Sequence, residues 1–141
     1  MSIRTLTQHA TRLTLGAFMS FAGIAHLTFA RDEFQAQVPD WVPGSTDAVV
    51  VASGVVEVGF GAALLAVPKY RRPVGIALAL FYLAIFPGNI AQFTEQRDAF
   101  GLDTDTKRFA RLFFQPVLIA AALWAGGIPR GPSKKQRRLE K

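Results

Sequence analysis

Hydrophobic residues are gathered into four long blocks, and most charged residues lie between these blocks or at the two ends of the chain. The blocks cover residues 13–30, 48–67, 74–93 and 112–128. A helix of about 20 apolar residues, rising about 1.5 Å per residue, matches the hydrocarbon thickness of a bilayer, which is about 30 Å. The pattern predicts an all-α fold: a transmembrane four-helix bundle in a single membrane domain, residues 1–128, followed by a tail, residues 129–141.

The second block contains one ionisable residue, Glu57, near its middle. Ser53 precedes it by four positions and therefore lies on the same side of a helix. A charged carboxyl at this depth costs about 2.5–3.5 kcal/mol or more unless it faces protein or water and finds a partner. Glu57 is therefore predicted to face the bundle interior, in either a functional role or the role of a neutral, hydrogen-bonded structural acid.

The first connection, residues 31–47, combines acidic residues with aromatic residues and with prolines at positions 39 and 43. Proline disfavours a continuous helix, and aromatic residues such as Trp41 are frequent at the membrane interface. The segment VPDWVPG, residues 38–44, is predicted to lie on the bilayer surface or to fold over the bundle as a lid. A tight, partly buried connector fits the pattern equally well.

Features within and between the later blocks predict how the helices meet. The segment PKYRRP, residues 68–73, is short enough to predict a turn between antiparallel spans. Pro87 predicts a kink, or a break of the last turn, near the far end of the third span. Small residues predict close packing between helices; they are Gly54, Gly59, Gly61 and the pairs Gly59/Ala63 and Gly75/Ala79.

Charge is distributed unequally between the two sides that four spans would create. Both termini and the 68–73 turn carry eleven of the sixteen Lys and Arg residues, whereas the two longer loops carry eight of the ten Asp and Glu residues. The positive-inside rule then predicts a multi-pass protein of the cytoplasmic (inner) membrane with both termini cytoplasmic. The tail 129–141 is predicted to be an unstructured polybasic strip on anionic lipid headgroups, with a docking peptide as the alternative. Since topology accounts for the net charge of +6, nucleic-acid binding is not predicted.

Each predicted span contributes a polar residue to the same outer half of the bilayer. His26, Asn89 and Gln115 lie about 6 Å below the outer ends of their spans, and Glu57 lies about 13 Å below. We therefore predict a polar pocket that opens to the outer face beneath residues 38–44. Its candidate ligand-binding residues are His26, Trp41, Ser53, Glu57, Asn89, Gln92 and Gln115. Its candidate apolar lining is Phe21, Phe29, Trp41, Phe81, Tyr82, Phe86 and Phe114.

Other interpretations of these polar residues remain open. Histidine, asparagine and glutamine in membrane bundles often form hydrogen bonds across helices as packing contacts only, worth about 0.6–2 kcal/mol each. An acid/base pair of Glu57 and His26 is also possible chemistry. Metal binding is not predicted, because a metal site needs more ligands than His26 and Glu57 and the sequence has no motif with the spacing of metal ligands. The chain has no cysteine, so it has no disulfide or thiol nucleophile, and no covalently attached cofactor is predicted.

Five segments taken in order resemble the DoxX-like family of small four-helix integral membrane proteins. They are AGIAHLTFARDEFQAQVPDWVP, SGVVEVGFGAALL, PKYRRP, FPGNIAQF and RLFFQPVLIAAALWA, within residues 15–125. The resemblance implies a membrane protein with both ends in the cytoplasm, and its motif positions here are His26, Glu57, Asn89, Arg111 and Gln115. Family members are linked to quinone-dependent sulfur oxidation and to membrane oxidoreductase complexes, and distant relatives bind sterol-like ligands or assist membrane-protein assembly. The lack of cysteine departs from the redox-active relatives and makes dithiol chemistry impossible here.

The expected function is that of a binding or accessory module. The outer pocket is expected to hold a quinone or a lipid-like small molecule, and the chain to be a subunit of a membrane redox complex. Membrane lipids and another membrane protein, or a second copy of the chain, are the expected partners. Two rival hypotheses are an enzyme that uses Glu57 and His26 for proton transfer on a hydrophobic substrate, and an assembly or interaction protein with a structural polar core.

Overall fold

The computed structural model describes residues 1–131 and 134–139, and this part of the chain is helical, without a strand. The all-α prediction is confirmed. The long helices are α1, Ile3–Leu27; α3, Thr46–Ala66; and α4, Arg71–Thr94. The last block forms α6, Phe114–Ala125, and the helix α5, Asp105–Leu112, precedes it and meets it at Phe113. The short elements are α2, Arg31–Phe34; η1, Gln35–Gln37; η2, Pro68–Tyr70; and α7, Lys134–Leu139.

Three helical segments of the described chain are long and apolar enough to cross a bilayer: Thr46–Ala66, Pro68–Thr94 and Asp105–Ala125. α1 reaches the same standard only together with α2 and η1, from which it is bent by 95°. It is less apolar because its first turns contain Arg4 and Arg12. These lengths and compositions are those of a membrane protein.

Two helices begin well before the apolar blocks from which they were predicted. α1 starts at Ile3 because the Ser2 hydroxyl accepts a hydrogen bond from the Thr5 amide at 3.1 Å. α5 starts at Asp105 because the Thr104 hydroxyl accepts from the Lys107 amide at 3.2 Å. Such N-caps satisfy backbone donors that have no partner within the helix, so polar residues extend the helices beyond the apolar stretches.

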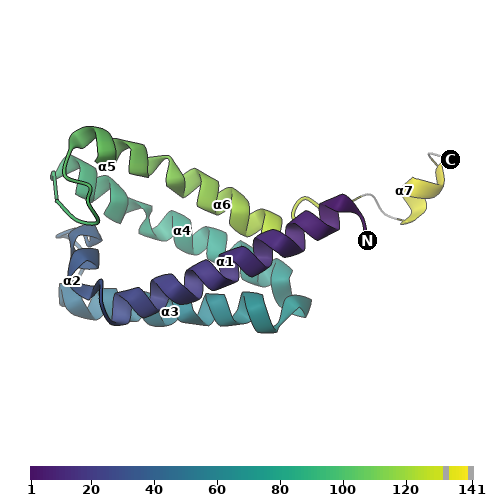
Figure 1. The fold of residues 1–141 in the computed structure, drawn as a ribbon, viewed down its shortest axis with the longest axis horizontal. Helices are drawn as coiled ribbons and strands as arrows, with labels where there is room; N and C mark the ends of the chain where they lie inside the picture. The colour runs from purple at the N-terminus through teal and green to yellow at the C-terminus, as the bar shows by residue number, and fades with distance from the viewer. Residues whose placement is uncertain (132–133, 140–141) are drawn as a thin grey trace.

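The long helices are arranged as two antiparallel pairs. α1 packs along α3, α4 packs along α6, and α1 also contacts α6. The pairs lie close together at the end that holds the N-terminus, η2 and the end of α6, and they diverge toward the end that holds α2 and α5 (Figure 1). The short η2 element joins α3 to the antiparallel α4, as the PKYRRP segment predicted.

Glycines permit the close contact between α1 and α3. A methyl carbon placed on Gly23 would lie 2.6 Å from the Gly54 carbonyl oxygen, and one on Gly54 would lie 2.7 Å from His26 Cβ. One on Gly61 would overlap the Ser20 side chain and lie 2.7 Å from the Ser20 nitrogen. The packing role predicted for Gly54 and Gly61 is therefore confirmed, whereas that of Gly59 is wrong, because a methyl there meets nothing within 4 Å.

The α4–α6 pair makes a similar contact at its other end. A methyl carbon on Gly75 would lie 2.6 Å from the Ala122 carbonyl oxygen and 2.8 Å from Gly126 Cα. Gly75 therefore has the close-packing role that its sequence context predicted. α4 also continues through Pro87 to Thr94, so the expected break of its last turn does not occur.

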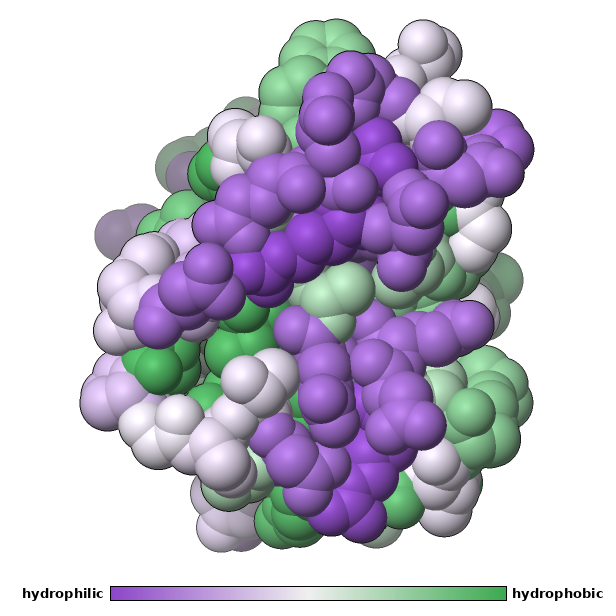
Figure 2. Space-filling view, turned by 90° about the vertical axis from the view of Figure 1, so that its left-hand side faces the viewer, coloured by the Kyte–Doolittle hydropathy of each residue, from purple (hydrophilic) through white to green (hydrophobic). Residues whose placement is uncertain are grey.

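Residues 31–47 cover the open end of the bundle as a partly buried connector. η1 lies directly on α4, since a methyl on Gly88 would overlap the Gln37 carbonyl oxygen. Arg97, which follows α4, donates to the Val38 carbonyl at 2.7 Å and to the Asp40 carboxylate at 2.9 Å. Trp41 is 74% exposed and does not close the end of the bundle. Figure 2 shows this end as hydrophilic patches with hydrophobic residues visible between them.

The tail differs in part from its prediction. Lys134–Leu139 form the short helix α7, where an unstructured strip was expected. Residues 132–133 and 140–141 of the predicted tail lie outside the described residues.

The glycine contacts predict opposite effects of alanine at two neighbouring positions of α3. Gly61→Ala should lower the free energy of unfolding by about 1–3 kcal/mol, because the methyl has backbone atoms of α1 in its way. Gly59→Ala should be neutral or should stabilise the protein by up to about 1 kcal/mol, since it removes a flexible residue from a helix without a clash. Thermal unfolding in a mild detergent measures both, and equal effects at the two positions would contradict the observed α1–α3 packing.

Candidate functional site

Glu57 and His26 meet at the contact between α3 and α1. Glu57 Oε2 lies 2.8 Å from His26 Nδ1, and the two residues are only 5% and 7% exposed. His26 Nδ1 also lies 2.8 Å from the Ala22 carbonyl oxygen, one turn earlier in α1. A single ring N–H cannot point at both oxygens, and Glu57 Oε2 has no hydrogen-bond partner in the described chain. One buried carboxyl oxygen is therefore left unsatisfied.

The surroundings of the His26 ring fix its position. Gly54, one turn before Glu57 on α3, leaves room for His26 Cβ. The Phe34 ring of α2 stacks on the imidazole, with ring centroids 3.3 Å apart and an interplanar angle of 16°. α2 therefore adds a stacking contact to the imidazole besides the contacts from α3, and it reaches the ring because the chain bends sharply after α1.

A second polar group links α4 to α6. Asn89 Nδ2 donates to Gln115 Oε1 at 3.3 Å, and Gln115 Nε2 donates to the Tyr82 carbonyl at 2.5 Å. Gln115 is completely buried, and Asn89 is 3% exposed. Asn89 Oδ1 has no partner in the described chain. Pro116, directly after Gln115, is tolerated because it stands in the first turn of α6, where backbone N–H groups lack helical partners.

Gln92 belongs to a different network at the open end of the bundle. It accepts a hydrogen bond from Gln37 at 3.1 Å, and its own amide approaches the Ala99 carbonyl at 3.5 Å. Gln92 is thus enclosed by η1 and by the loop after α4, and it is 1% exposed. In this structure it connects loops to α4.

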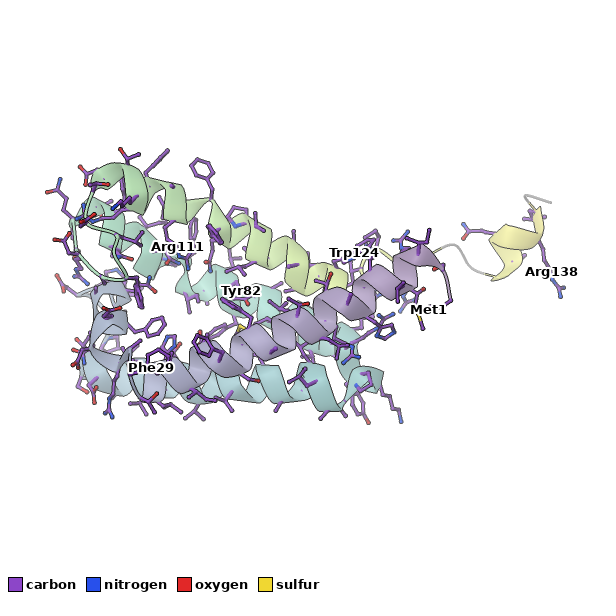
Figure 3. All side chains as sticks on the ribbon, viewed as in Figure 1. Met1, Phe29, Tyr82, Arg111, Trp124 and Arg138 are labelled. Atoms are coloured by element: carbon purple, nitrogen blue, oxygen red, sulfur yellow. The ribbon has the colours of Figure 1, made fainter. Side chains whose placement is uncertain are left out.

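A cavity of about 470 Å³ lies between the two helix pairs. Glu57, His26 and Gln115 line it, together with Tyr82 and Arg111; Figure 3 places Tyr82 midway along α4 and Arg111 nearer the open end. The Tyr82 hydroxyl donates to the Met19 sulfur at 2.8 Å. The remaining walls are mostly apolar, and they include Phe18, Phe21, Phe29, Phe34, Ile85 and Leu118.

Arg111 is the cation of this cavity. Its Nη1 is buried without a hydrogen-bond partner, and no carboxylate of the described residues pairs with it. Its guanidinium carbon lies 5.8 Å from the centre of the Phe114 ring. Arg111 precedes Gln115 by four positions and therefore projects from the same face across the α5–α6 junction. This spacing is visible in the sequence, so it could have placed both residues in one site without the resemblance to DoxX-like proteins.

A second cavity, of about 420 Å³, lies between α3, α4 and the connector 38–44. Trp41, Ser53 and Phe81 line it, and it shares His26, Phe34, Gln37 and Ile85 with the first cavity. The stacked rings of His26 and Phe34 thus stand between two hollows.

The predicted site residues do not share one pocket, because some line the first cavity, some line the second and some line neither. His26, Glu57 and Gln115 line the first cavity, and Trp41 and Ser53 line the second. Asn89 approaches the first cavity only through Gln115, and Gln92 lines neither. Among the predicted aromatic lining, Phe86 and Phe114 border neither cavity. No group of three or more potential metal ligands occurs among the described residues.

Comparison with known proteins identifies the family of the chain. Residues 15–126 match the model of a family described as a domain of unknown function (DUF8561), and the chain belongs to that family. No curated protein and no solved structure matches it.

The Asn89–Gln115 contact predicts energetic coupling between α4 and α6. Asn89→Leu and Gln115→Leu should each destabilise the protein, because each leaves a buried amide or carbonyl without its partner. The double variant should be more stable than the sum of the single effects predicts, by about 0.6 kcal/mol and at most about 1.7 kcal/mol, the average and the maximum measured for hydrogen bonds between membrane helices. A double-mutant cycle of unfolding free energies measures this coupling, and strict additivity would show that the two amides do not interact.

Proposed function

We propose that this chain is a four-span, multi-pass protein of the cytoplasmic (inner) membrane whose cavity between the helix pairs binds a quinone or another lipid-like small molecule. Both termini lie in the cytoplasm in this proposal, and the chain acts as an accessory subunit of a membrane redox complex, as the resemblance to DoxX-like proteins implies. The site itself, not the resemblance, supports the binding role.

The charge distribution supports the proposed orientation. The N-terminus, the η2 turn and the end of α6 lie at one end of the bundle, where they carry Arg4, Arg12, Lys69, Arg71 and Arg72 (Figure 1). Acidic and basic residues are mixed at the other end, where Arg31 pairs with Asp47 and Arg108 pairs with Asp98. An excess of unpaired cations marks the cytoplasmic side.

The unsatisfied carboxyl oxygen of Glu57 beside a cavity is the observation that carries the binding proposal. A buried oxygen without a donor costs about 1–3 kcal/mol, and a ligand hydroxyl that donates to it recovers that cost. The cavity volume of about 470 Å³ lies within the usual range for small-molecule sites, about 300–1,000 Å³. Phenylalanines and leucine surround the polar residues, so an amphiphile with a compact polar head and an apolar body suits the cavity.

The polar residues favour different parts of such a head group. Glu57 accepts a hydrogen bond from a hydroxyl, whereas Arg111 donates to a carbonyl or phenolate oxygen. A quinol presents hydroxyl groups at opposite ends of one ring, so one can donate to Glu57 while the other accepts from Arg111; a quinone has carbonyl oxygens only and can accept from Arg111. Gln115 and Tyr82 are already held by α4 and Met19, so they preserve the shape of the site.

Mass spectrometry of small lipophiles that co-purify with the intact protein in mild detergent tests this function. We expect one quinone or lipid species near stoichiometric amount in the wild type, and its loss from Glu57→Gln or His26→Ala. Asp32→Asn is the matched control, because it neutralises an exposed carboxylate of α2 that does not line the cavity. Absence of a stoichiometric species from the wild type, or its equal retention in all variants, would contradict the pocket and favour the assembly protein.

The close Glu57–His26 pair favours a second candidate, a membrane enzyme that transfers a proton to or from a hydrophobic substrate. A carboxyl and an imidazole 2.8 Å apart at the wall of a cavity can exchange a proton with a bound molecule. In an enzyme, Glu57→Gln should keep the bound species and abolish its turnover in purified membranes. Loss of the species itself from Glu57→Gln, with Asp32→Asn unchanged, would support the binding role instead.

A further inference from the structure

A cluster of cations occupies the end of the bundle opposite to α2 and α5. One face of α1 carries Arg4, Gln8 and Arg12, because these residues are spaced four apart. This face is turned inward, since Gln8 and Arg12 are only 4% and 7% exposed. Arg71, the first residue of α4, joins them from the side of the Gly127 turn. A methyl on Gly127 would lie 3.0 Å from Arg71 Nη2. His9 accepts a hydrogen bond from Arg12 at 3.2 Å and interacts electrostatically with both Arg12 and Arg71.

Two of these arginines already interact with the ends of helices. Arg4 donates to the Pro129 carbonyl and lies over the Trp124 ring, 5.4 Å from its centre. Arg12 donates to the Leu64 carbonyl in the last turn of α3. The cation of Arg12 complements the negative end of α3, whereas Arg4 binds the chain just beyond the end of α6. These contacts explain why the arginines point inward, but they use only part of the donor capacity of the cluster.

Three donors of the cluster have no acceptor. Arg4 Nε, Gln8 Nε2 and Arg71 Nη1 are buried and lack a hydrogen-bond partner within the described chain. None of Arg4, Arg12 and Arg71 forms an ion pair with a carboxylate among residues 1–131 and 134–139. The arginines of the other end, in contrast, are paired: Arg31, Arg97 and Arg108 each contact an aspartate or glutamate. Apart from Arg111 in the cavity, the buried arginine donors that lack an acceptor within the described chain therefore all lie in this cluster.

We infer that Arg4, Gln8, Arg12 and Arg71 form a binding site for a phosphate group, supplied by the headgroup of an anionic phospholipid or by a free phosphate. Guanidinium groups bind phosphate oxygens through two parallel N–H donors, and the side-chain amide of Gln8 adds a second kind of donor. Arg4 and Arg71 are partly exposed, so an anion can reach the cluster, and the covered donors turn toward it by side-chain rotation. This site is separate from the cavity and does not depend on the proposed function.

The experiment measures binding to the full-length protein in a neutral detergent, by native mass spectrometry and by the shift of the unfolding temperature. The probes are phosphatidylglycerol, phosphatidylcholine and inorganic phosphate. We expect phosphatidylglycerol to bind and to raise the unfolding temperature, and Arg71→Gln to weaken this binding by about tenfold, because one bidentate phosphate contact is lost. Arg72→Gln is the matched control: it removes the same charge from the neighbouring residue, which is not part of the cluster. Every variant retains the basic tail, so the contribution of the tail is common to all.

Gln8→Leu separates a built site from general attraction by positive charge. It leaves the net charge unchanged and removes a buried donor without an acceptor, so the variant should fold at least as well as the wild type. Weaker phosphatidylglycerol binding by Gln8→Leu supports the site, and the same losses with inorganic phosphate would identify a free phosphate as sufficient. Equal binding by wild type, Gln8→Leu, Arg71→Gln and Arg72→Gln, or a complete lack of response to both anionic probes, would overturn the proposal.

Discussion

The glycine-mediated contact between α1 and α3 is the constraint on which the rest of the structure depends. Gly23, Gly54 and Gly61 let the two helix backbones approach so closely that even a methyl group would collide with backbone or Cβ atoms. Because Gly54 stands against His26 Cβ and one turn before Glu57, the same contact brings the imidazole and the carboxyl within 2.8 Å of each other. The only ionisable residue in the interior of α3 is thereby enclosed by protein, as a bilayer requires.

The arrangement in two pairs explains why a cavity exists at all. α1–α3 and α4–α6 are each closely packed, but they diverge toward the end covered by α2 and η1 (Figure 1). Side chains from both pairs border the resulting space without filling it, so Glu57 and Arg111 face a shared hollow from opposite pairs. Connector residues close it in part: Phe34 packs on His26, and Arg97 anchors the backbone of residues 36–38.

The two ends of the bundle have different electrostatics. At the open end, arginines pair with acidic residues and bind loop carbonyls, which orders the connectors. At the other end, Arg4 and Arg12 donate to backbone carbonyls and Arg71 lies beside Gly127, and none of the three pairs with a carboxylate in the part of the chain that the structure describes. The loops of the open end carry eight acidic and five basic residues, whereas the other end has an excess of positive charge, and this difference supports the proposed orientation.

Hydropathy predicted the long helices well, because apolar length is a property of each segment alone. The inward position of Glu57 followed in the same way from the energetic cost of a charge in lipid. Contacts between segments were harder to predict: Gly59 resembles Gly61 in sequence, yet it faces open space, and Gln92 binds loops although it was predicted to share one pocket with Asn89. The cavity and the place of Arg111 in it depend on how far the pairs diverge and on where α5 joins α6. The four-residue spacing of Arg111 and Gln115 places both on one face, but no local pattern encodes the divergence of the pairs that opens the cavity.

An experimental structure of the protein purified in mild detergent tests the central claim most directly, that the two helix pairs enclose a site for an amphiphilic molecule at Glu57. The account predicts elongated non-protein density between the pairs, with its polar end within hydrogen-bonding distance of Glu57 and its apolar end against Phe18, Phe21 and Leu118. Helix pairs that close on each other, with the space filled by side chains and Glu57 Oε2 bonded to a protein donor, would contradict it.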